Sequence, residues 1–398
     1  MATAVLNRLV TSLDIGGGNF RKGIHEVGGQ RPRLVSLVSK ELKFNSPAQM
    51  IGACARALTA RELESQRTVV VSVAAALKEG TGVIKKLTNH QALEVRDIPF
   101  GPELSKALSK KVGREIEVVV INDGVAGGWA EFSPEGAMAD LPEGSLGMAL
   151  IIGNGVGGRL FRKVGSGIEP VVGGFEPGHF AIPFSIMEEL EITGYYGFDA
   201  QCGCGITGNT NRKESICLER LINGPEMGRL IGLVMREIVG NLPIEEILAN
   251  RIVQHVYAKL GKPLDNRIRP WTAADVVWQN FGNEDVTAVL QATQGREPVL
   301  KDFLRIQATL LAHRLEVLQR AFDDQGPITF AFIGSVGHYW GEYLIPHLQA
   351  ASESLRGVAY RQVTDWAEQP QYRVGKLPPH ETNVVGNLYY LLHHEAQA

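Results

Sequence analysis

The sequence has 398 residues, of which 44% are hydrophobic and 21% are charged, the composition of an ordinary folded protein with about two domains. A net charge of −3 provides no general attraction for nucleic acid or for an anionic membrane, so we expect neither as a partner. The first residues form no secretory signal and no run of about 18 apolar residues occurs, so the expected location is the cytoplasm. Four cysteines in so long a chain exclude a disulfide scaffold.

The chain opens on a predicted strand, a glycine turn and a returning strand. An apolar run through Leu13 and Ile15 contains the acid Asp14, and the alternating pattern resumes at Phe20 after the turn Gly16, Gly17, Gly18 and Asn19. Consecutive glycines supply the positive φ values of a tight turn and leave their N–H groups open to a phosphate. Asp14 stands where a carboxylate can hold a metal–phosphate complex. The alternative is an ordinary glycine-rich hairpin with an incidental acid.

The segments after this hairpin alternate between helices and strands. A serine followed by proline predicts a helix from residue 46 to about residue 59, and 102–111 has a helical pattern. Apolar runs rich in valine predict buried strands over 68–76 and 115–121. This alternation predicts an α/β layered domain with a largely parallel sheet. A polar, proline-containing stretch over 133–143 marks the expected domain boundary.

A second strand, glycine turn and strand lies at 147–162, with the turn formed by Gly153, Asn154, Gly155, Val156, Gly157 and Gly158. Residues 152–163 resemble residues 15–22, because each reads as a strand, a glycine turn and then Phe-Arg-Lys. Two halves that each open on a glycine hairpin predict duplicated domains that face each other across a cleft.

A third glycine turn follows the predicted strand 327–333 and contains Gly334, Ser335 and Gly337. It suits the sugar or base edge of a nucleotide beside a helix N-terminus, although any tight strand-to-helix connection also uses glycine. Long amphipathic helices are predicted over 299–322 and 383–394. Cys54 shares an apolar helix face and is expected to be a core residue.

Two pairs of polar residues are candidates for chemistry. Asn122 and Asp123 end a buried strand, the usual place for a functional group in a parallel sheet. Asp123 is suited to take a proton from a substrate hydroxyl that attacks phosphorus, or it caps the following helix. Glu176 and His179 lie three residues apart across a Pro-Gly bend. A carboxylate and an imidazole suit the vicinal hydroxyls of a sugar, although either residue in a loop can be plain surface.

Three of the cysteines lie close together in the sequence, at Cys202, Cys204 and Cys217. With His179 they would complete a tetrahedral zinc site, and four protein ligands would make that zinc structural. Its task would be to hold the loop that carries Glu176. The alternative is a set of ordinary loop thiols.

Taken in chain order, these motifs resemble those of the ROK family (repressors, open reading frames, sugar kinases) within the actin-like and hexokinase-like ATPase superfamily. Residues 14–19 look like its first phosphate motif, 122–123 like its catalytic motif and 153–158 like its second phosphate motif. Glu176-Pro177-Gly178-His179 is similar to the family's Glu-x-Gly-His signature, and Cys202-Gly203-Cys204-Gly205 is similar to its zinc loop.

The resemblance implies an α/β fold of two duplicated actin-like (ribonuclease H-like) domains facing across a cleft. The first domain is expected at 1–132 and the second at 133–380, with a C-terminal helix at about 381–396 that packs back on the first.

The activity that the resemblance implies is that of an ATP-dependent, Mg²⁺-assisted hexose kinase similar to glucokinase. Asp123 would be the general base, and Asp14 would assist Mg²⁺. The sugar hydroxyls would be held by Asn122, Glu176, His179 and Glu219. The nucleotide would be held by the glycine turns, at Gly16, Gly17, Gly18, Asn19, Gly153, Asn154, Gly155, Gly157, Gly334, Ser335 and Gly337.

The sequence also departs from the family pattern. Threonine and lysine are usual where Gly18 and Asn19 stand, threonine is usual at Asn154, and a second asparagine is usual at Val125. The third cysteine is also displaced, which puts Cys217 as a zinc ligand in question. These differences leave the sugar open, with glucose or a close hexose expected first and an N-acetylated hexosamine as the alternative.

Two functions of other classes remain as rivals to the kinase. A sugar-binding relative with weak or no kinase activity is compatible with the altered motifs. A transcription regulator is not expected, because the 13 residues before Asp14 are too few for a helix-turn-helix. The oligomeric state is left open, a homodimer included.

Overall fold

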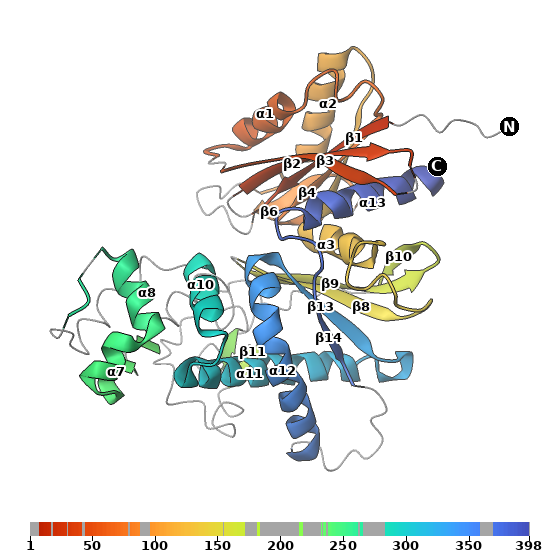
Figure 1. The fold of residues 1–398 in the computed structure, drawn as a ribbon. Helices are drawn as coiled ribbons and strands as arrows, with labels where there is room; N and C mark the ends of the chain where they lie inside the picture. The colour runs from red at the N-terminus through yellow and green to blue at the C-terminus, as the bar shows by residue number, and fades with distance from the viewer. Residues whose placement is uncertain are drawn as a thin grey trace. The chain divides into compact units, whose positions relative to one another are not determined.

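The computed structural model describes residues 8–16, 19–29, 31–41, 44–78, 80–87, 96–153, 155–171, 181–183, 215–217, 232, 234–235, 238–261, 263–265, 283–358 and 369–397 (Figure 1). The chain divides into two compact units, and each is described by itself. The first is drawn from 1–149, 158–173 and 375–398, and the second from 150–157 and 174–374. The predicted domain limits, 1–132 and 133–380, stay a prediction.

The structure contains two five-stranded sheets with the same strand order. The first sheet runs β3 (Arg33–Glu41), β2 (Asn19–Val27), β1 (Arg8–Ile15), β4 (Thr68–Val73) and β7 (Glu117–Asn122). The second runs β10 (Gly167–Pro170), β9 (Val156–Val164), β8 (Leu146–Ile152), β13 (Ile328–Ile333) and β14 (Gln371–Val374). When the strands of each sheet are numbered by their order along the chain, both sheets have the third strand at one edge, followed by the second, the first, the fourth and the fifth. The repeated order confirms the predicted α/β fold built from two related sheets.

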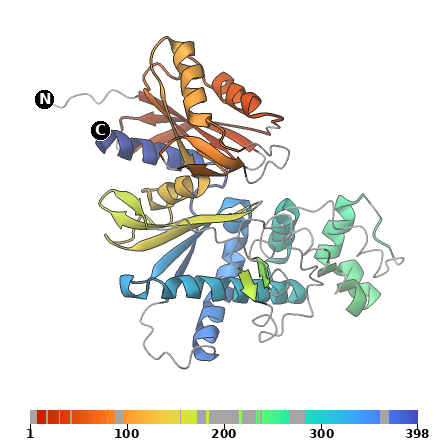
Figure 2. The same ribbon diagram turned by 180° about the vertical axis from the view of Figure 1, so that it is seen from behind.

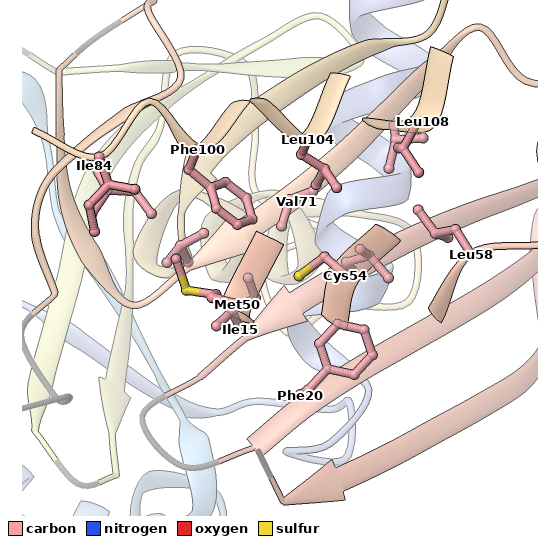
Figure 3. Packing of buried hydrophobic residues seen from close by; sticks show 14 of the residues in the cluster. Ile15, Phe20, Met50, Cys54, Leu58, Val71, Ile84, Phe100, Leu104 and Leu108 are labelled. Carbon is pink, nitrogen blue, oxygen red and sulfur yellow. The ribbon is translucent and has the colours of Figure 1, made fainter. Parts of the chain in front are cut away.

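Alternation along β1 and β4 gives the first sheet two different apolar faces. Leu13, Ile15 and Val71 belong to a buried cluster formed with helices α1 (Pro47–Ala57) and α2 (Phe100–Val112) (Figure 3). Val10 and Val70 instead belong to the cluster on the opposite face, with α3 (Asp123–Phe132) and α13 (Thr382–Gln397). Because successive side chains of a strand point to opposite faces, Asp14 and Ser72 must lie on the face that α13 covers.

Helix α13 closes this second face of the sheet, as both ribbon views show (Figures 1 and 2). Its Gly386 lies so close to α3 that an added Cβ would stand 1.8 Å from the carbonyl oxygen of Ala126. The helix expected over 383–394 is confirmed as α13. On the other face, Cys54 is fully buried, as expected of a core residue, and burial raises the pKa of its thiol to about 12.

The predicted strand 68–76 is in fact two strands. β4 ends at Val73, and β5 (Ala75–Lys78) then forms an antiparallel hairpin with β6 (Val83–Leu87). The reason is a change of partner, because the N–H of Ala74 still donates to the carbonyl of Ile15 whereas the next residue pairs with Leu87.

The helices predicted at residue 46 and over 102–111 are observed as α1 and α2, and Ser46 caps α1 by accepting from the N–H of Gln49 at 3.2 Å. The strand 327–333 and the helix 299–322 are observed as β13 and α11 (Pro298–Arg320). The remaining elements are β11 (Ala181–Pro183), β12 (Ser215–Cys217), α7 (Ile244–Ala249), α8 (Arg251–Lys259), α10 (Asn283–Thr293), η2 (Asp323–Gln325) and α12 (Gly334–Val358).

Candidate active site

Asp14 is a fully buried carboxylate held by three side chains from three other elements. Its Oδ2 accepts from Nη1 of Arg21 at 2.6 Å, and its Oδ1 accepts from Oγ of Ser72 at 2.8 Å and from Nδ2 of Asn383 at 3.0 Å. Arg21 and Ser72 are the residues directly opposite Asp14 in β2 and β4. One cation and two neutral donors thus offset the cost of burying the charge.

The first glycine turn lies next to this cluster. The N–H of Gly16 donates to the carbonyl of Asn19 at 2.9 Å, which closes the turn between β1 and β2. Nη1 of Arg21 would stand 3.5 Å from a Cβ on Gly16, so the guanidinium lies beside the turn. Gly17 and Gly18 lie outside the described residues.

Strand β7 delivers Asn122 and Asp123 to the start of α3. Asn122 is the N-cap, because its Oδ1 accepts from the N–H of Gly124 at 2.8 Å, and its Nδ2 donates to the carbonyl of Ala75 at 3.1 Å. Asp123 is the first helical residue, where a negative charge is favoured by the helix dipole, and its Oδ1 also accepts from Gly124 at 3.0 Å. The cap considered for Asp123 is therefore formed by its neighbour.

The catalytic candidate lies near part of the second glycine motif. A Cβ added to Gly124 would stand 3.5 Å from the backbone of Gly158 in β9. The absence of side chains at both positions lets the start of α3 approach this strand closely. The first unit therefore brings the residue after Asp123 together with the end of the second motif.

In the second unit, the second and third glycine turns meet at the end of β8. A Cβ on Gly153 would lie 4.0 Å from Oγ of Ser335. Gly334 has a φ of +83°, and its Cβ would stand 2.6 Å from the carbonyl oxygen of Ile152, so this position requires glycine. Gly337 is also close, with its Cβ position 3.5 Å from Cβ of Ile152. Residues predicted to bind one nucleotide thus converge on one strand end.

The backbone of the second glycine motif is open on at least one side. A Cβ on Gly157 would have no heavy atom of the described chain within 4 Å, apart from its own neighbours. The N–H of Gly153 donates to the carbonyl of Gly155 at 2.9 Å, which makes the turn tight. Asn154, between them, lies outside the described residues. A backbone with no atom at the Cβ position has room there for a phosphate.

The remaining predicted residues lie outside the described part of the chain, namely Glu176, His179, Cys202, Cys204 and Glu219. Cys217 ends β12, which pairs with β11. Within the described ranges no group of three or more His, Cys, Asp or Glu residues is arranged to hold a metal ion. The helices of the described chain include none that is long and apolar enough to cross a membrane.

The side chains that support Asp14 were not found from the sequence. Ser72 is a polar residue within an apolar strand, and Asn383 belongs to a helix more than 360 residues further along the chain. Asn387, one turn later, donates to the carbonyl of Leu13 at 2.7 Å and to Oγ of Ser72 at 3.0 Å. The available signal was the spacing of four between the two asparagines, which places both on one helix face.

Two sheets of one strand order, with glycine turns after β1 and β8, define an α/β protein built on two related sheets. No model of a known protein family matches the sequence, and no curated protein does so either. Solved structures do match over nearly the whole chain. A ROK family transcriptional regulator, a homologue of the E. coli MLC protein, is 13% identical with a TM-score of 0.64, covering 98% of this chain and 80% of that one.

Two enzymes are also among the structural neighbours. A ROK family glucokinase from Streptomyces griseus, in complex with glucose and AMPPNP, is 18% identical with a TM-score of 0.57, covering 95% of this chain and 97% of that one. A ROK hexokinase from Thermus thermophilus is 22% identical with a TM-score of 0.53, covering 97% and 99%. The chain therefore has the fold of ROK family proteins and sugar kinases.

Proposed function

We propose that the protein is an ATP-dependent sugar kinase that transfers the γ-phosphoryl group to a hexose hydroxyl, with glucose or a close hexose as acceptor. The observation that carries this proposal is the placement of Asp123 at a strand end and helix start, where the next residue, Gly124, lies beside Gly158 of the second glycine motif. A glucokinase that binds glucose and AMPPNP shares the fold over 95% of this chain, which supports the same substrates here.

In this reaction Asp123 takes the proton of the acceptor hydroxyl. The hydroxyl oxygen forms a bond to the γ-phosphorus while the bond from that phosphorus to the β–γ bridging oxygen breaks, which leaves ADP and a protonated carboxyl group. Its position in the first turn of α3 orients the carboxylate through the Gly124 N–H. Asn122 would donate one of its two Nδ2–H groups to a sugar hydroxyl, because the carbonyl of Ala75 accepts only the other.

Mg²⁺, when bound, would neutralise charge on the transferred phosphoryl group. The Asp14 carboxylate does not fit direct coordination of that ion, because it is fully buried and paired with Arg21. Three of about four acceptor positions on the Asp14 carboxylate are used by Arg21, Ser72 and Asn383. A contact between Asp14 and the ion would therefore be indirect and would require this cluster to open.

The other roles follow the motifs. The ATP phosphates are assigned to the two glycine turns, and the adenosine side to the turn that begins at Gly334, whose Ser335 lies near Gly153. The sugar is assigned to Asn122, Glu176, His179 and Glu219. A structural zinc is assigned to His179, Cys202, Cys204 and Cys217, and metal analysis of the purified protein tests that assignment.

A second candidate function is a sugar-binding protein with weak or no kinase activity. The observation that favours it is the ion pair between Arg21 and Asp14, which neutralises the acid that would otherwise support Mg²⁺. A ROK family transcriptional regulator among the structural neighbours is consistent with such a role.

The test is an ATP-consumption assay over glucose, mannose, N-acetylglucosamine and N-acetylmannosamine, with sugar binding measured by calorimetry in parallel. Turnover with one of these sugars supports the kinase, whereas binding without turnover supports the second candidate. In the variant Asp123→Asn we expect kcat to fall by about 10²- to 10⁴-fold while the sugar Kd is unchanged. The exposed Asp324→Asn serves as the control. Full activity in Asp123→Asn would remove this residue as the base.

A further inference from the structure

The start of helix α12 carries an aromatic side chain that the fold leaves exposed. Tyr339 is 42% exposed, and among the described residues it is the only aromatic one in the group of large, well-exposed apolar side chains. Its neighbours on the helix are covered. Trp340 is buried, and Tyr343, one turn later, packs against Gly295, where an added Cβ would stand 2.7 Å from its ring. An exposed tyrosine offers an apolar ring face together with a polar tip, a combination common at binding surfaces.

The position of Tyr339 in α12 relates it to the third glycine turn. Residues four apart share a face of a helix, so Tyr339 stands on the same face as Ser335. A long side chain in a helix points back toward the helix N-terminus and covers the preceding turn. The Tyr339 ring is therefore expected to lie over the turn that contains Ser335, whose Oγ would be 4.0 Å from a Cβ on Gly153.

This end of α12 borders the open backbone of the second glycine motif. A Cβ on Gly157 would have no heavy atom of the described chain within 4 Å, so a phosphate has room there. Four residues of helix rise about 6 Å, a step that the ribose of a nucleotide can span. A ligand with its phosphates at the glycine motif can thus place its base at Tyr339. Gly157, Ser335 and Tyr339 all belong to the second compact unit.

The neighbouring imidazole restricts the orientation of the Tyr339 ring. The ring centroids of His338 and Tyr339 are 5.0 Å apart and their planes are at 87°, an edge-to-face contact. Such a contact covers at most one face of the phenol ring, so at least one face is left for a flat ligand. Purine bases are flat, and stacking on an aromatic side chain stabilises any base because every base has a π face.

We propose that Tyr339 is the surface on which the base of the bound nucleotide stacks, so that α12 supplies the base end of the nucleotide site. This inference rests on the proposed function, because it takes the ligand to be a purine nucleoside triphosphate. It adds a residue that none of the glycine motifs contains. Because stacking uses the ring face and no hydrogen-bonding group, Tyr339 adds affinity for the base without selecting adenine over guanine.

The test is calorimetric binding of AMPPNP, GMPPNP and the base-free ligand tripolyphosphate to the full chain in the presence of Mg²⁺. In Tyr339→Ala we expect the Kd of AMPPNP to rise by about 5- to 150-fold, the range for loss of one base–aromatic stack, and that of GMPPNP to rise by a similar factor. Binding of tripolyphosphate should stay within about twofold. Tyr339→Phe keeps the ring face and should bind both nucleotides within about twofold of the wild type.

Val317→Ala is the control, because Val317 is 40% exposed and lies near the end of α11, which contacts the start of β13 rather than the turn after it. It should bind all three ligands as the wild type does. If Tyr339→Ala binds AMPPNP like this control, or loses tripolyphosphate equally, the stacking role is wrong while the kinase proposal stands. If the wild type binds neither nucleotide, both are wrong. Tyr339→Leu keeps the apolar bulk without an aromatic face, so it should also lose nucleotide affinity and provides the same comparison if Tyr339→Ala fails to fold.

Discussion

The close contact between α3 and α13 leads to a strong prediction for Gly386→Ala. The added methyl would stand 1.8 Å from the carbonyl oxygen of Ala126, and that oxygen belongs to the backbone of a helix rather than to a movable side chain. Helix α13 must therefore shift by more than about 1 Å, because a close-packed interior has no free volume to absorb the methyl group.

The magnitude follows from what this shift breaks. Overpacking of a core costs about 1–3 kcal/mol. The same movement stretches the bonds from Asn387 to Leu13 and Ser72 and the bond from Ser12 to Val384, at about 1 kcal/mol each. Alanine regains about 1 kcal/mol of helix propensity over glycine. We expect the free energy of unfolding to fall by about 3–5 kcal/mol.

The assay is urea unfolding followed by circular dichroism and by tryptophan fluorescence. Trp129 of α3 reports on this contact, because its ring lies 4.8 Å from that of His393 and 5.9 Å from that of Tyr390, both in α13. The control is Gly52→Ala in α1, whose Cβ would meet only the flexible end of Arg56 at 3.2 Å. That variant should be neutral or slightly stabilised. A Gly386→Ala protein within about 1 kcal/mol of the wild type would refute the reasoning.

Three further predictions concern buried charge. Arg21→Ala leaves the buried carboxylate of Asp14 without its cation and should lower the free energy of unfolding in urea by about 3–5 kcal/mol. The double variant with Asp14→Asn should recover most of this lost stability. Equal stability of the single and double variants would contradict this reasoning. Burial lowers the pKa of His25 to about 4, so the unfolded chain binds the proton more readily, and unfolding free energy should fall by about 3 kcal/mol as the pH drops from 6.5 to 4; His25→Gln should flatten this part of the pH curve. Burial raises the pKa of Glu131 to about 7, so the contribution of this carboxyl group to the unfolding free energy has the opposite dependence on pH. This contribution is present in full below pH 4.5 and is lost as the pH rises to 7. A Glu131→Gln variant with an unchanged pH curve would show this assignment to be wrong.

The sequence alone determined the features that depend on neighbouring residues. The Ser46 cap, the valine-rich run of β4 and the glycine turns after β1 and β8 are local patterns, because hydrogen bonding and φ preference act over a few residues. The likeness of the two glycine hairpins also indicated two related sheets, and the shared strand order confirms it. Asp14 and Asp123 were selected by this reasoning, although their catalytic roles stay proposals.

Tertiary structure alone decided the partners of these residues. The partners of Asp14 are 7, 58 and 369 residues away, and nothing near Asp14 in the sequence indicates the last of them. The cap of α3 belongs to Asn122 rather than Asp123, because the helix already begins at Asp123 and Asn122 keeps the extended backbone of an N-cap. Contacts of this kind depend on the register and the distance between whole elements, which the burial of many side chains sets together and no single segment encodes.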